Sequence, residues 1–276
     1  MSKMSVGAER LARALEVGQQ AAARVTSGKP VQIRFDLEEG AYVDSETGII
    51  HLPPLGDISD TAVDIIRGLA DHEAGHMGFT DLEIFKDQMD KSKEDVKDGK
   101  PANFGGINHT FFNSIEDNRV DKKSSEKSLG VARNIDWLSR HHLYDRDLLS
   151  KIEDNFSEDE RAQALALISM EANFKGTEHE EFVKEEASRI SELYPLMRKE
   201  VEEELEKIPS LKDTEETLDL SNKIVEKLKK YIEEEKQDRK KVVKKKKGKG
   251  SGKKGEGVEG AEGEAEGEAE GEAEGE

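Results

Sequence analysis

The C-terminal part of the sequence is too poor in apolar residues to form a packed core. Eleven Lys and Arg and a single Asp lie between Lys236 and Lys254, and ten Glu with no basic residue follow between Glu256 and Glu276. Burial of so little apolar surface cannot offset the conformational entropy that folding removes. Residues 236–276 are therefore predicted to be a disordered Lys/Gly then Glu/Ala/Gly tail, and a folded domain must form from residues 1–235.

The charge of the chain limits the partners it can bind. The formal net charge is −19 at pH 7, and the two tail blocks cancel (11 − 1 = +10 against −10), so the whole −19 belongs to residues 1–235. An acidic domain repels nucleic acid, which could then bind only through the Lys-rich part of the tail. The sequence has no apolar run of about 18 residues and no signal-peptide pattern, so no membrane partner and a cytoplasmic location are expected.

Residues 31–145 carry the mixture of strand and helix patterns that predicts an α+β fold. Apolar and polar residues alternate over residues 31–35, as in a half-buried strand, and residues 41–52 have the pattern of a hairpin. A helix is predicted over residues 61–79, capped by the polar residues just before it. We expect a small antiparallel sheet packed on this helix, preceded by an N-terminal helix in residues 1–30.

Helical patterns dominate the remainder of the folded part. Residues 91–106 are polar and contain glycine and proline, which predicts a surface loop. Residues 178–207 have the pattern of one long helix, and residues 146–235 as a whole form a predicted helical extension of the core. The acidic faces of these helices are a possible docking surface for a protein partner.

The residues most informative about chemistry form an HExxH motif. His72 and His76 lie four positions apart on the predicted helix, so both imidazoles project from one face and can hold one zinc ion. Glu73 is then placed to take a proton from a zinc-bound water, as in zinc peptidases. The sequence contains no cysteine, so thiolate ligands are excluded and the zinc ligands must come from imidazole and carboxylate groups.

A third zinc ligand is expected on the acidic helix that begins near residue 108. Glu116 is the first choice, with Asp117 as the alternative. Asp121 could orient a ligating histidine from behind, through its second ring nitrogen. Arg119 could neutralise either Asp121 or Glu116 as a bidentate partner.

These residues together resemble a known family. Leu69 to His76, followed by the pattern Asn113-x-x-Glu116-Asp117-x-Arg119-x-Asp121, resembles the peptidase-like domain of the cobaltochelatase T-subunit family and its phage-encoded relatives. The resemblance covers roughly residues 30–145 and implies a zincin-like fold of the gluzincin class, in the host cytoplasm for a phage-encoded member. In that family a charged linker commonly leads to a von Willebrand factor A domain; this sequence either stops before such a domain or comes from a member without one.

Two functions follow as hypotheses. The first is a zinc metallopeptidase, in which zinc held by His72, His76 and Glu116 activates a water, Glu73 accepts its proton, and a peptide or protein substrate adds along the strand at residues 48–52. The alternative is a non-catalytic, zinc-stabilised scaffold, a chelatase-like module that docks onto a partner. The two differ in whether the metal keeps an open coordination position or is closed by a fourth protein ligand.

Overall fold

The computed structural model describes most of the chain between residues 31 and 248. The described residues are 12, 16, 18–20, 23, 25–26, 31–35, 41–44, 46–53, 59–97, 102–145 and 147–248. The chain divides into two compact units, residues 1–233 and 234–276. The predicted N-terminal helix lies mainly outside the described residues, although those described between residues 12 and 25 are helical.

The sheet is mixed rather than antiparallel, so this part of the predicted fold is wrong. Its strands are β1 (Gln32–Phe35), β2 (Tyr42–Val43) and β3 (Ile49–Leu52), in the order β1-β3-β2. β2 and β3 form the predicted antiparallel hairpin, but β1 pairs with β3 in parallel. An alternating pattern does not specify strand direction. In the structure β3, which buries three apolar side chains, lies between the other two strands. The segment at residues 48–52, along which a substrate strand is expected to add, is therefore the centre of the sheet, and β1 and β2 are its edges.

Helix α2 (Asp60–Phe79) carries the HExxH motif and packs against this sheet. It begins at a Ser59 cap, whose hydroxyl accepts a hydrogen bond from the amide of Ala62 at 3.2 Å. One core cluster joins the sheet, α2 and helix α5 (Leu129–Arg140); its buried members are Val25, Val31, Ile50, Leu52, Ile66, Ala70, Ala74, Val131 and Ile135. The described residues are thus mostly helical with one small sheet, in agreement with an α+β class.

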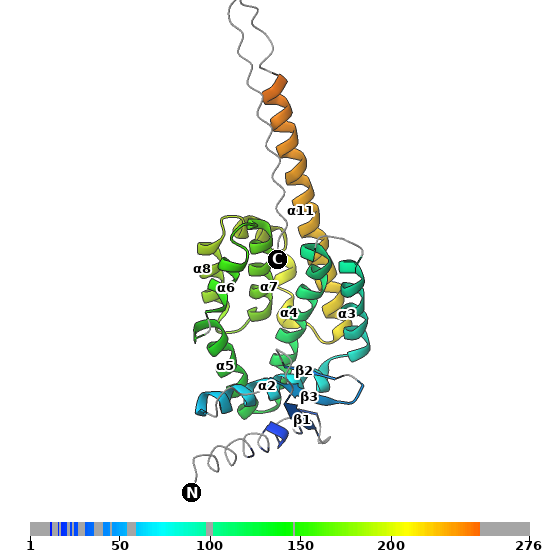
Figure 1. The fold of residues 1–276 in the computed structure, drawn as a ribbon, viewed down its shortest axis with the longest axis vertical. Helices are drawn as coiled ribbons and strands as arrows, with labels where there is room; N and C mark the ends of the chain where they lie inside the picture. The colour runs from blue at the N-terminus through cyan, green and yellow to red at the C-terminus, as the bar shows by residue number, and fades with distance from the viewer. Residues whose placement is uncertain are drawn as a thin grey trace, which may run out of the picture. The chain divides into compact units, whose positions relative to one another are not determined.

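The most extensive contacts of the helical part involve α4 (Ala102–Lys127), which lies between α3 (Leu82–Lys97) and α7 (Glu160–Phe174) in Figure 1 and also packs on α2 and α5. The polar loop predicted at residues 91–106 is wrong over most of its length, because α3 continues to Lys97 and α4 begins at Ala102. Residues 91–97 are mostly Lys, Glu and Asp, and Lys and Glu favour helix, so the breakers Gly99 and Pro101 act only between the two helices.

The predicted single helix over residues 178–207 is three helices. They are α8 (Glu180–Ile190), α9 (Tyr194–Glu200) and α10 (Glu202–Leu205). Ser191 ends α8, and its hydroxyl accepts hydrogen bonds from the amides of Leu193 and Tyr194. Pro195 lies in the first turn of α9, where a residue without an amide proton is tolerated.

The other elements complete the helical part: a π-helix η1 (His141–Asp145), α6 (Leu148–Asn155), a 3-10 helix η2 (Ile208–Ser210) and α11 (Thr214–Gly248). α11 extends beyond residue 236, where the sequence predicts disorder to begin, and the rest of the tail lies outside the described residues. Among the helices in the described part of the chain, none has the length and apolarity that crossing a membrane requires.

Candidate metal centre

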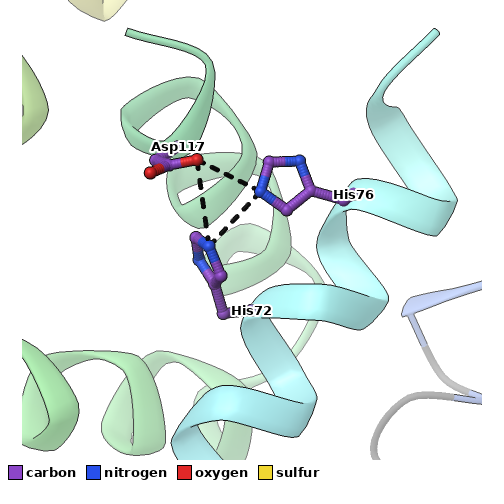
Figure 2. Close-up of side chains that lie close together, drawn as sticks. All are labelled: His72, His76 and Asp117. Carbon is purple, nitrogen blue, oxygen red and sulfur yellow. Dashed lines mark hydrogen bonds and ion pairs between the residues drawn. The ribbon is translucent and has the colours of Figure 1, made fainter. Parts of the chain in front are cut away.

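Three side chains from two helices meet over the HExxH motif. His72 and His76 project from α2, and Asp117 projects from α4 towards both imidazoles, as Figure 2 shows. The Nε2 atoms of the two histidines are 3.3 Å apart. Oδ1 of Asp117 lies 3.2 Å from Nε2 of His76 and 3.9 Å from Nε2 of His72. The three ligand atoms therefore form a small triangle.

The size of this triangle suits a tetrahedral zinc ion. Zn–N and Zn–O bonds of about 2.0–2.1 Å place tetrahedral ligand atoms about 3.3 Å from one another. Two edges of the triangle, at 3.2 and 3.3 Å, match that value, and the third, at 3.9 Å, is slightly longer. Within the part of the chain that the structure describes, the group contains two imidazoles and one carboxylate and no fourth charged ligand.

Hydrogen bonds behind the histidines fix which ring nitrogen faces the centre of the site. Nδ1 of His72 lies 2.8 Å from Oδ1 of Asp121, a carboxylate that can only accept while ionised. Nδ1 of His76 lies 3.0 Å from the hydroxyl of Thr80, whose own proton is donated to Glu116 at 2.8 Å. Each Nδ1 therefore carries a proton, and in the neutral rings both Nε2 lone pairs point at each other. A cation between them removes this conflict.

The carboxylates around the site also favour positive charge at its centre. Burial lowers the pKa of His72, but the carboxylates of Asp121, Asp117 and Glu73 outweigh it and raise the pKa to about 10. Without a metal, the positive charge must therefore come from a proton on the ring. A divalent ion bound by the same atoms would replace that proton.

Glu73 lies next to His72 on α2 and faces the same cavity. Its side chain is buried, with the residue only 6% exposed. Burial raises the pKa of Glu73, which makes its carboxylate a stronger base than an exposed glutamate. The residue that the motif suggests as a general base is thus in an environment that increases its basicity.

Glu116, the first choice for the third ligand, is committed to other partners. Its carboxylate is fully buried and accepts hydrogen bonds from Nε of Arg119 at 2.9 Å, from Thr80 at 2.8 Å and from Thr214 at 2.9 Å. The two adjacent carboxylates therefore differ in role: Glu116 stabilises the helix junction, and Asp117 faces the histidines. Of the two partners considered for Arg119, the structure pairs it with Glu116.

A cavity of about 800 Å³ opens in front of the three ligand atoms. Its wall is formed partly by β2 and partly by apolar side chains; those of Leu69, Phe85, Met89, Leu138 and Phe174 contribute. Asn113 also lines it and donates to Oδ2 of Asp117 at 2.9 Å, which leaves Oδ1 towards the histidines. Thr80 was not predicted from the sequence, and Asn113 was predicted only as part of the family pattern, although each lies one helical turn from a candidate ligand, at i+4 after His76 and i−4 before Asp117.

Comparison with known proteins gives one match. A protein-family model described as "Cobalamin biosynthesis protein CobT" matches residues 8–276, nearly the whole chain. No curated protein and no solved structure is similar enough to match.

Proposed function

This chain belongs to the CobT family of cobalamin biosynthesis proteins, and on that basis we propose that it is a cobaltochelatase-like module built around one bound zinc ion. Family membership favours this alternative over the peptidase that the HExxH motif predicts. In the proposal, His72, His76 and Asp117 hold the ion. Asp117 takes the place of Glu116, because the Glu116 carboxylate already accepts hydrogen bonds from Arg119 and two threonines.

The observation that carries this proposal is the convergence of two imidazole nitrogens and one carboxylate oxygen within a triangle of zinc-like dimensions. Two nitrogens and one oxygen, without thiolate, are a ligand set that zinc binds at sites with an open position. Asp121 and Thr80 support it by holding each ring in the tautomer that offers Nε2.

A second candidate function, hydrolysis of a peptide bond, rests on Glu73 and on the cavity. When bound, zinc polarises a carbonyl and lowers the pKa of a coordinated water to about 7. Glu73, whose buried carboxylate faces the same cavity, would serve there as the base that accepts a proton and returns it to a leaving amine. Among the described residues, three candidate ligands face a cavity and no fourth protein ligand joins them, which favours this second function over a purely structural ion.

The metal content of the purified full chain tests the proposed site. We expect about one zinc per chain for the parent and for Glu73→Gln, and a large loss for His72→Ala and for Asp117→Asn, since each of these removes a ligand. Unchanged zinc content in both His72→Ala and Asp117→Asn would exclude the proposed ligand set.

A second measurement separates the two functions. Parent and Glu73→Gln proteins, equally loaded with zinc, are incubated with an unfolded protein substrate, and new N-termini are quantified. A chelatase-like module gives no cleavage with either protein. Cleavage by the parent that Glu73→Gln abolishes would instead establish the peptidase.

A further inference from the structure

A second group of metal-ligating side chains lies outside the site already described, where α5 approaches the N-terminus of α8. It consists of Asp136 on α5 and of Glu178 and His179, which immediately precede α8. One ligand atom from each of the three lies within 4.8 Å of the others. Nε2 of His179 is 3.3 Å from Oδ1 of Asp136 and 4.0 Å from Oε1 of Glu178.

The buried member of this group has an unused nitrogen. The side chain of His179 is only 5% exposed, and its Nε2 makes no hydrogen bond with any residue in the described ranges. Tyr144 and Phe174 pack against the ring with their planes steeply inclined to it, at centroid distances of 6.0 Å each. The imidazole is therefore held in one orientation, with a buried nitrogen directed at two carboxylates. A buried polar atom without a hydrogen bond is costly unless a ligand satisfies it.

The two carboxylates near this nitrogen, those of Asp136 and Glu178, are exposed to solvent. Arg140 pairs with both carboxylates, with its Nε 3.1 Å from Oδ2 of Asp136. The Arg140 side chain is 54% exposed, so it can move into solvent when another cation takes its place.

We propose that Asp136, Glu178 and His179 form a second site for a divalent first-row transition metal ion, separate from the HExxH centre. One imidazole and two carboxylates are a mixed nitrogen and oxygen set, which suits ions such as Zn²⁺, Co²⁺ or Ni²⁺ better than Mg²⁺ or Ca²⁺. Because Asp136 and Glu178 are exposed and Arg140 competes for them, the site binds its ion more weakly and exchanges it faster than the HExxH centre does. Phe174 packs on His179 and also lines the cavity, so the two metal sites share one wall.

Titration of the metal-free full chain with Co²⁺ tests this proposal, because bound Co²⁺ is followed by its visible absorption. The parent protein is expected to bind two equivalents, one tightly and one weakly. His179→Gln is expected to lose only the weak equivalent, and His72→Ala only the tight one. If His72→Ala kept the tight equivalent, the HExxH centre would be contradicted but the second site would not. The two proposals therefore fail independently.

Two further variants guard against misfolding and against a purely structural role. Glu178→Gln changes an exposed side chain and is expected to weaken the weak site without lowering the thermal midpoint. Arg140→Gln removes the competing cation and is expected to tighten the weak site. Binding of a single equivalent by the parent, or Co²⁺ affinity that is unchanged in both Glu178→Gln and Arg140→Gln, would show that these side chains form only an ion-pair cluster and would overturn the proposal.

Discussion

Thr80 connects a candidate metal ligand to the buried carboxylate behind it. Its hydroxyl accepts from Nδ1 of His76 and donates to Glu116, so one side chain orients the imidazole and links it to the core of the helix junction. Thr80→Val keeps the shape of the side chain and removes both hydrogen bonds. We expect zinc affinity to fall about 10–100-fold, the usual effect of losing such a partner, as measured by competition with a chromophoric chelator.

Thr80→Ser is the matched control for this prediction, because serine retains the hydroxyl. Its zinc affinity is expected to stay close to that of the parent. Equal affinities for Thr80→Val, Thr80→Ser and the parent protein would mean that the orientation of His76 does not depend on this hydrogen bond.

At the same scale, the sequence places the two histidines on one face of a helix but does not decide which carboxylate lies beside them. His72 and His76 follow from helical periodicity alone, which the chain carries locally. Glu116 and Asp117 are adjacent on α4, so their side chains point about 100° apart around the helix. The choice between them depends on how α4 is rotated against α2, a tertiary property that no local pattern contains.

That rotation depends on a close approach of the two helices at Gly75. A Cβ atom added at Gly75 would lie 2.5 Å from Oγ of Ser124 and 2.5 Å from Cγ1 of Val120, both on α4. Gly75→Ala is therefore expected to push α4 away from α2. The variant should lose about 1–3 kcal/mol of unfolding free energy in urea denaturation, even though alanine favours helix, and zinc affinity should fall because Asp117 moves with α4.

Gly106 provides the contrasting helical glycine, because no atom from another element in the described part of the chain lies within 4 Å of the position its Cβ would take. Gly106→Ala is expected to stabilise the protein by about 0.5–1 kcal/mol and to leave zinc binding unchanged. If both alanine variants stabilised the protein equally, helix propensity alone would determine the change in unfolding free energy. The contact between α2 and α4 at Gly75 would then be looser than described.

The elements predicted wrongly from the sequence are those whose boundaries or pairing depend on tertiary packing. The start of α2 is predicted well, because its Ser59 cap lies at a clear change in pattern. The parallel pairing of β1 with β3 is not predictable from alternation, since a period of two residues is the same for both directions. The long α4 is stabilised by packing against α3 and α7, and this packing outweighs the low helix propensity of the glycines near its start.

Within residues 1–233, the buried ion pair of Arg119 and Glu116 links the candidate metal centre to distant parts of the chain. Arg119 and Glu116 are almost fully buried against each other. Arg119 also donates to the carbonyl of Phe79, at the end of α2, and to that of Lys212, while Thr214 at the start of α11 donates to Glu116. The end of the HExxH helix, the middle of α4 and the start of α11 therefore meet at a single pair of opposite charges.

We expect the charge of Arg119 to contribute more to the stability of this junction than its volume does. Arg119→Met leaves the Glu116 carboxylate buried without a counter-charge, so we expect a loss of about 3–5 kcal/mol of unfolding free energy in urea denaturation. The double variant Glu116→Gln with Arg119→Met removes both charges, and it is expected to be more stable than Arg119→Met alone. Additive losses in the double variant would show that the two side chains act separately, and the junction could not then couple the metal centre to α11 through this pair.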